Sequence, residues 1–231
     1  MSERTPAEAG DARLRAAICA AGRRLGSRGL INAGEGNLSF RLGNGSLLTT
    51  PTGRRKDELV PDDLSTVPLD AAKGPAPSGP RPSSDIAIHR AIYRARPDVV
   101  AVVHAHLPAS MALTLAGEIP DPAALPETAY HLPVLPFVAF GAMGSEELAG
   151  RVASAFGATD PSPVAVVLER HGAIAIGSAG SAAAGGTAGA VTATVLEAAL
   201  IAAVDRLELV EVLCRTIRDA ILVQAARDRS V

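Results

Sequence analysis

The stretch that decides the fold is PSSDIAIHRAIYRARPDVVAVVHAH, residues 82–106. Its first part repeats apolar side chains at Ile88, Ala91, Ile92 and Ala95, which is the spacing of one helical face, and it stops before a proline. Its last part is a run of β-branched residues of strand length. A helix that leads directly into a buried strand is typical of an α/β domain.

The segments on either side extend this pattern. Strands are predicted for NLSFRL, GSLLTT, AVVLERHG and AIAIG, and helices for DARLRAAICAAGRRLGSRGL, 108–115, GSEELAGRVASAF and about 181–221. The apolar stretch 190–204 contains Glu197 and is too short to span a membrane, so we expect a buried helix there. Residues 71–82 suit either an interdomain linker or a surface loop, and the loop is favoured because the flanking segments fit one sheet.

Composition limits the classes of partner. The chain has 231 residues, a net charge of -2 and 48% hydrophobic residues, so one domain can bury a large core. No run of lysine or arginine marks a surface for nucleic acid or acidic lipid, which leaves small molecules or further copies of the chain as expected partners. Only two cysteines occur and the N-terminus lacks an apolar signal-peptide core, so a cytoplasmic location is expected.

Two histidines stand one residue apart at the end of the β-branched run. His104 and His106 would project from the same face of a strand, where two imidazoles can hold one metal ion, although two polar residues at a strand end need no metal. His171 offers a third imidazole after another apolar strand, and Gly172 beside it permits a close approach. Three imidazoles and an open position are the arrangement of a catalytic zinc site.

The remaining two histidines lack this strand-end setting. His89 lies inside the predicted helix and is expected to be packed or to support the site, whereas His131 is expected in an exposed loop. The serines of PSSD could simply cap the helix, with Asp85 at its positive end. The same groups could hold a phosphate while the carboxylate moves a proton. GEGNLS and TPTGRR are equally compatible with ordinary turns or with ligand cradles.

In order along the chain, GEGNLSFR, LLTTPTG, residues 82–106 and LERHGAIAIG resemble the class II aldolase/adducin family, and in layout the zinc-dependent L-fuculose-phosphate aldolases. The resemblance extends from about Asp11 to Leu213. It implies one α/β domain over 11–222, with a central, mostly antiparallel sheet flanked by helices on both faces. A flexible N-terminus, 1–10, and a C-terminal tail, 223–231, would flank this domain.

The resemblance also implies roles for individual residues. Asp85 would act as the acid and base near the metal, where the aldolases have a glutamate. Tyr130 and Glu127 are weaker candidates for a supplementary proton donor. The cofactor would be Zn²⁺, although imidazole also accepts Mn²⁺ and Co²⁺. The metal ligands would be His104, His106 and His171, and the substrate-phosphate pocket Asn37, Thr52, Gly53, Ser83 and Ser84.

The implied activity is that of a lyase in carbohydrate metabolism. A zinc-dependent aldolase would cleave a ketose 1-phosphate, of the L-fuculose or 5-deoxyketose type, into dihydroxyacetone phosphate and an aldehyde through a metal-stabilised enediolate. The implied assembly is a homotetramer with sites between subunits. Alternatives on the same site are a pentulose-phosphate 4-epimerase, a methylthioribulose-phosphate dehydratase and a sugar-acid phosphate decarboxylase. A non-catalytic, adducin-like module is the remaining alternative.

One departure separates the chain from the aldolases. Asp85 is one methylene shorter than glutamate, which changes the reach of the carboxylate. PSSD is usual in the epimerase branch, but the expected later residues are missing, because no histidine follows His171 and no tyrosine follows Tyr130. The aldolase interpretation is therefore preferred over the epimerase.

Overall fold

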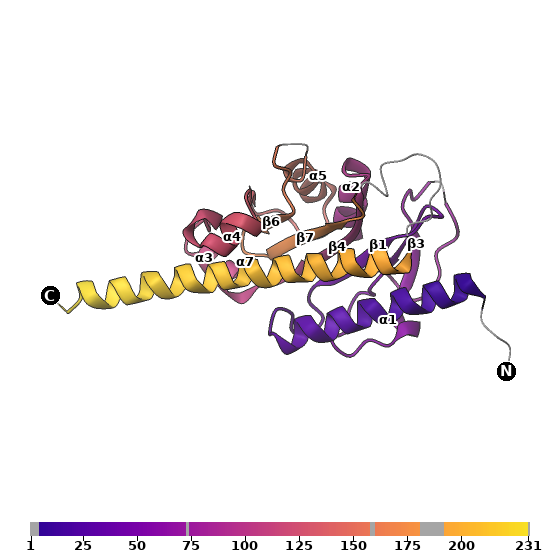
Figure 1. Ribbon diagram of the computed structural model, residues 1–231, viewed down its shortest axis with the longest axis horizontal. Coiled ribbons are helices and arrows are strands. Elements are labelled where there is room, and N and C mark those ends of the chain that lie inside the picture. Colours follow the sequence, from indigo (N-terminus) through magenta and orange to yellow (C-terminus); the bar gives the residue numbers. More distant parts are fainter. Residues whose placement is uncertain (1–4, 73, 158–159, 181–191, 231) are drawn as a thin grey trace.

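The computed structural model describes residues 5–72, 74–157, 160–180 and 192–230, in which a sheet lies between helices (Figure 1). The sheet has seven strands in the order β3-β2-β1-β4-β7-β6-β5, and only β5 and β6 pair in parallel. The predicted mostly antiparallel sheet is therefore confirmed. Its strands are β1 (Asn37–Arg41), β2 (Ser46–Thr49), β3 (Ser65–Pro68), β4 (Val99–Ala105), β5 (Phe137–Val138), β6 (Ala165–Leu168) and β7 (Gly172–Ser178).

Helices cover both faces of this sheet, as predicted. α2 and α5 pack against one face, and α1, α3 and α7 lie on the other. The short α4 lies beside α7. The helices are α1 (Pro6–Ser27), α2 (Ile86–Ala95), α3 (Pro108–Leu115), α4 (Pro126–His131), α5 (Glu146–Ala155) and α7 (Ala193–Asp228), with 3-10 turns η1 (Pro61–Asp63) and η2 (Pro122–Ala124).

The central strand β4 shows why two helical layers are needed. All its residues are buried, and from Ala101 onward its side chains alternate between the two faces, after a register shift between Val99 and Ala101. Val99 and Val102 join the core under α2 and α5, whereas Ala101, Val103 and Ala105 join the core under α7. A strand buried on both faces explains the continuous apolar run in the sequence.

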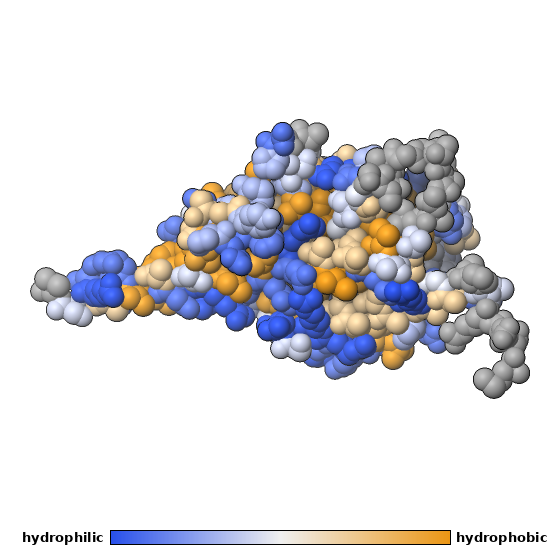
Figure 2. Space-filling view, in the orientation of Figure 1, coloured by the Kyte–Doolittle hydropathy of each residue, from blue (hydrophilic) through white to orange (hydrophobic). Residues whose placement is uncertain are grey.

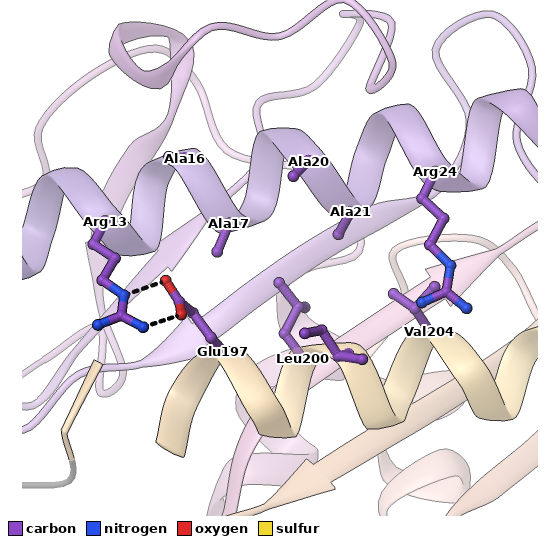
Figure 3. Close-up of a pocket in the computed structure, with 10 residues that line it drawn as sticks. Arg13, Ala16, Ala17, Ala20, Ala21, Arg24, Glu197, Leu200 and Val204 are labelled. Atoms are coloured by element: carbon purple, nitrogen blue, oxygen red, sulfur yellow. Dashed lines mark hydrogen bonds and ion pairs between the residues drawn. The ribbon is translucent and has the colours of Figure 1, made fainter. Parts of the chain in front are cut away.

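α1 and α7 run side by side in the same direction (Figure 1). Small residues such as Ala17 and Ala21 face Leu200 and Val204 across the contact, where an apolar groove of about 520 Å³ remains (Figure 3). One end of the groove is closed by Arg13, whose guanidinium donates two hydrogen bonds of 2.7 and 2.6 Å to Glu197. The hydrogen-bonded pair of Arg13 and Glu197 links the two long helices at this end.

Several limits differ from the sequence predictions. α1 begins at Pro6, because Thr5 and Glu8 form a capping box ahead of the expected start at Asp11. α7 continues to Asp228, past the expected end near residue 221, and the predicted beginning of this helix at 181–191 lies outside the described residues. The domain limits of 11–222 remain a prediction.

The middle of the chain contains elements that the sequence analysis missed. α4 places His131 at the end of a helix, so the prediction of a loop there was wrong. Six residues are too few to show a helical repeat, and a proline at the first position is the only local signal. By contrast, the described residues of this stretch, 71–72 and 74–82, form a loop as expected, with Ser78 bridged to Thr66 of β3. Among the described residues, no helix has the length and apolar character required for a membrane span.

Candidate active site

The structure brings the three predicted metal ligands together. His104 lies near the end of β4, His106 follows that strand, and His171 occupies the turn between β6 and β7. β4 and β7 are neighbours in the sheet, with Ala105 opposite Ala173. The imidazole centroids are 4.8 to 4.9 Å apart, and potential ligand atoms of the three rings lie within 4.8 Å of one another. The three side chains can therefore share one ion.

Two glycines let the backbone segments meet at this point. Gly172 has φ +94°, and a Cβ there would lie 2.1 Å from the carbonyl oxygen of Ala105. Gly36 has φ +69°, and its Cβ would lie 2.9 Å from the carbonyl oxygen of His104. Any larger residue would separate these segments. The glycine beside His171 is thus required by the packing of the histidines.

The chemistry of the imidazoles fits a divalent metal. His104 Nδ1 donates a hydrogen bond of 3.0 Å to the carbonyl of Ala173, so its Nε2 carries the lone pair. The Nε2 atoms of His104 and His171 are buried and have no hydrogen-bond partner among the described residues. Burial lowers the pKa of all three histidines, which favours the neutral form that binds metal.

Asp85 lies at the start of α2, and its charge acts on His106 and His171. It occupies the N-cap position, but its side chain does not cap the helix, and its backbone N–H donates to Ser83 Oγ at 3.3 Å. Ser83 thus binds the start of the helix, as the PSSD motif allowed, although the N-cap position itself is Asp85. Asn37 Nδ2 donates to Asp85 Oδ2 at 3.0 Å, whereas Oδ1 is buried and finds no partner in the part of the chain that the structure describes. One carboxylate oxygen is held and the other remains available.

A chain of buried hydrogen bonds connects Asp85, through Asn37, to side chains of β1 and α2. Because the amide of Asn37 points at a carboxylate, its oxygen faces His89 Nε2, which must carry a hydrogen. His89 Nδ1 then accepts from Ser39 Oγ at 2.7 Å. Tyr93 lies 2.9 Å from that hydroxyl and donates to the backbone oxygen of Ser39 at 3.0 Å. Burial lowers the pKa of His89 to about 3, so the ring is neutral. This confirms the expected supporting position of His89.

The residues expected to bind phosphate lie on three neighbouring segments. Thr52 and Gly53 form a turn, and Thr52 N donates to Arg81 O at 3.1 Å, which links this turn to the segment of Ser83 and Ser84. The turn at Gly34 comes within 3.7 Å of Gly53, measured from a Cβ placed on Gly34. Thr52, Gly53 and Ser84 are exposed and Ser83 is buried. Asn37 is also buried, and its amide already contacts Asp85 and His89.

Two charged residues of the site were missed by the sequence analysis. Glu35 Oε1 lies 3.6 Å from His106 Nδ1, where it can orient the ring. Lys56 is 1% exposed, and burial lowers its pKa to about 8 against the opposing charge of Asp85. Glu35 belongs to the GEGNLS motif, so the sequence offered a reason to consider it. Lys56 has no such motif beyond its position after TPTGRR, because its burial results from tertiary packing.

The two supplementary candidates lie elsewhere in this chain. Tyr130 is 81% exposed on α4 and its ring packs edge-on against His131. Glu127 lines a hollow between α4 and α7 with residues such as Asp205 and Arg206. Within the described part of the chain, neither side chain contacts the three histidines. Their proposed roles as proton donors would require a different subunit of an assembly.

Comparison with known proteins gives a family match over most of the chain. The model of the family described as "Class II Aldolase and Adducin N-terminal domain" matches residues 16–217. Methylthioribulose-1-phosphate dehydratase from Methylococcus capsulatus is 42% identical over 99 residues, 43% of this chain and 47% of that protein, so this match spans about half of the relative. The enzyme of that name from Acidiphilium cryptum is 35% identical over 183 residues, 74% of this chain and 84% of the relative.

Two further similarities involve other reactions. A 3-oxo-tetronate 4-phosphate decarboxylase from Cupriavidus necator is 36% identical over 151 residues, 62% of this chain and 66% of that protein. The crystal structure of L-fuculose-1-phosphate aldolase from Thermus thermophilus superimposes with a TM-score of 0.72 and 31% identity, and the match covers 93% of this chain and 97% of that structure. The similar proteins thus share a fold but differ in the bond that they break.

Proposed function

Because the chain belongs to the class II aldolase and adducin family, we propose that this enzyme is a metal-dependent lyase for a phosphorylated keto-sugar or keto-sugar acid. The observation that carries the proposal is a buried carboxylate beside a cluster of three histidines: Asn37 holds one oxygen of Asp85, the other oxygen has no partner among the described residues, and the charge of Asp85 acts on His106 and His171. A non-catalytic module has no need for this arrangement, because unpartnered buried polar atoms destabilise a fold.

In the proposed reaction, different residues of the site bind the metal, transfer the proton and bind the phosphate. His104, His106 and His171 would hold Zn²⁺, and Mn²⁺ or Co²⁺ fit the same imidazole ligands. Such an ion supplies Lewis-acid polarisation of a substrate carbonyl. The free oxygen of Asp85 would remove or return a proton at the neighbouring carbon. The exposed turn at Thr52 and Gly53, together with Ser84, would bind the phosphate.

Elimination of water or carbon dioxide is our preferred reaction. The dehydratase and decarboxylase relatives support it, and both reactions can proceed with a single carboxylate that moves one proton at a time. Aldol cleavage, of L-fuculose 1-phosphate or a 5-deoxyketose phosphate, is the second candidate because of the similarity to the Thermus thermophilus aldolase. That reaction also requires a base for the proton of the hydroxyl that becomes the aldehyde carbonyl, and in one subunit neither Tyr130 nor Glu127 contacts the histidines.

In an assembly of several copies, a neighbouring subunit would add side chains to the site. The C-terminal end of α7 extends beyond the rest of the molecule (Figure 2), and Ile221, Leu222 and Val223 are exposed there. Exposed apolar side chains on a projecting helix suit a contact with another subunit. A homotetramer with sites between subunits is therefore part of the proposal, and Tyr130 from a neighbour is its candidate proton donor.

Product analysis would test the proposed reaction. The metal-loaded protein would be incubated with 5-methylthioribulose 1-phosphate, 3-oxo-tetronate 4-phosphate and L-fuculose 1-phosphate, and products would be identified by mass. Loss of water or carbon dioxide supports the preferred reaction, whereas two fragments support aldol cleavage. Asp85→Asn should lower kcat by about 10²- to 10⁴-fold without changing the metal content. Absence of turnover of all three substrates would contradict the proposal.

A further inference from the structure

Lys56 is a buried cation to which no part of the proposed chemistry has assigned a role. The chain has 22 lysines and arginines, of which only Lys56 and Lys73 are lysines. The ammonium of Lys56 donates hydrogen bonds of 2.8 Å to the carbonyl of Gly34 and 2.6 Å to the carbonyl of Arg54. A planar guanidinium would be larger and would present its donors in a different geometry. The compact ammonium therefore matches this space.

Helix α1 packs directly against the backbone of Lys56. A Cβ on Gly22 would lie 2.1 Å from the carbonyl oxygen of Lys56, and a Cβ on Gly26 would lie 2.6 Å from Cβ of Asp57. Glycine at both positions lets the loop lie directly against the helix. The side chain of Lys56 consequently extends away from α1 and toward the turns of the site.

The two carbonyls that Lys56 contacts belong to two different parts of the proposed site. Gly34 precedes Glu35, which lies beside His106, and Asn37, which holds Asp85. Arg54 follows Gly53 in the proposed phosphate-binding turn. Because an ammonium has three donors, these two bonds leave one N–H available. Lys56 is thus a cross-link between the carboxylate side and the phosphate side of the site.

Burial of an ammonium requires compensation, and two neutral carbonyls provide only part of it. The charge of Asp85 acts favourably on Lys56. An anionic ligand at the adjacent turn would provide a second favourable charge. A negative ligand at this turn would therefore add to the stabilisation that Asp85 already gives the ammonium.

We propose that Lys56 is a positioning residue that clamps the turns at Gly34 and Gly53 and so sets the geometry for binding the substrate phosphate. The inference rests on the proposed function, because it takes the turn at Thr52 and Gly53 as the phosphate site. Loss of the clamp should affect binding of phosphate more than the chemical step. KM and kcat should therefore respond differently.

Lys56→Met tests the clamp, and Arg55→Gln is the matched control. Arg55 is an exposed neighbour paired with Asp57 and Glu58, so its substitution removes the same charge from the same loop without touching the carbonyls of Gly34 and Arg54. In Zn²⁺-loaded protein, Lys56→Met should weaken binding of inorganic phosphate about tenfold or more, measured by calorimetry, and raise KM by a similar factor. kcat and metal content should change less than about threefold, which a mere loss of folded protein would not produce.

Lys56→Gln covers the case in which the methionine variant does not fold. Its amide keeps two N–H donors but no charge, so phosphate binding should fall between the control and the methionine variant. If the phosphate affinity and KM of the folded Lys56 variants stay within about twofold of Arg55→Gln, the positioning role is wrong. If wild type has no lyase activity but Lys56→Met still loses phosphate, the proposed reaction fails and the clamp stands. Wild type that turns over substrate without binding phosphate overturns the clamp.

Discussion

Replacement of Gly172 by alanine tests whether the packing of β4 and β7 positions the metal ligands. Gly172 follows His171, and a Cβ on it would lie 2.1 Å from the carbonyl oxygen of Ala105 and 2.8 Å from Cα of His106. Ordinary contacts of a Cβ begin at 3.4 Å, so the two strands must separate by more than 1 Å at this place. His106 and His171 stand on opposite sides of that gap.

The expected cost of the substitution has two parts. An L-residue in the left-handed region costs about 1–2 kcal/mol, and insertion of a methyl group into a packed contact costs about 1–3 kcal/mol. The free energy of unfolding should therefore fall by roughly 2–5 kcal/mol, which corresponds to a decrease in Tm of roughly 4–20 °C for a chain of this size. Displaced ligand rings should also weaken metal binding by about 10- to 100-fold.

Gly177→Ala provides the matched control on the same strand. A Cβ on Gly177 would lie 1.9 Å from the carbonyl oxygen of Ala199 in α7, away from the histidines. Both variants should lose stability in urea unfolding of the metal-free protein. Only Gly172→Ala should lose affinity in a Co²⁺ titration followed by visible absorption. Equal metal affinities of the two variants would refute the claim that this contact positions the ligands.

Two further predictions concern buried polar groups outside the metal cluster. Glu211 is 3% exposed, accepts hydrogen bonds from Ala109 N at the start of α3, and pairs with Arg215, so Glu211→Ala should lower the free energy of unfolding by about 3 kcal/mol. The surface variant Asp219→Ala on the same helix, whose side chain is 61% exposed, should cost less than about 1 kcal/mol in the same urea experiment, and equal losses would contradict a special role for the buried cap. His89 has its pKa lowered to about 3 by burial, so the unfolded chain takes up a proton near pH 6.5 and the folded chain does not. His89 alone should therefore contribute a loss of about 2 kcal/mol from pH 6.5 to 5, in addition to the loss from the three site histidines, whose pKa burial also lowers. His89→Gln should show a shallower pH dependence than wild type, and an unchanged slope would refute this assignment.

The sequence predicted those parts of the fold that depend on local patterns. β1, β2, β4, α2 and α3 follow directly from apolar periodicity, β-branched runs and prolines. The convergence of His104, His106 and His171 could be predicted for the same reason, since each stands near the end of an apolar run. The local structure at His171 could not be predicted, because this residue lies in a turn after β6 rather than on a strand. Its position depends on Arg170, which adopts φ +57° in that turn.

The groups behind the site could not be predicted because tertiary contacts create them. Ser39 and Tyr93 are separated by 54 positions, yet their side chains meet between β1 and α2. In the sequence Ser39 is an ordinary polar residue of a strand, and Tyr93 an ordinary apolar position of a helix. Ser39, His89 and Asn37 form a polar row along β1 and α2. Only the register of β1 against β4, with Asn37 opposite His104, shows that this row continues into the site.

This row also fixes the carboxylate that we propose as the acid and base of the site. Asp85 lies at the N-cap of α2, where the backbone turns, and the amide of Asn37 fixes its Oδ2 while His89 fixes Asn37. The position of the carboxylate is then set by its partners rather than by the length of its side chain. Asp85→Glu should consequently lower kcat by about tenfold or more, because the added methylene displaces the contact with Asn37. Metal content should stay constant in that variant, and kcat equal to or above wild type would show that reach, rather than the hydrogen-bonded chain, limits the carboxylate.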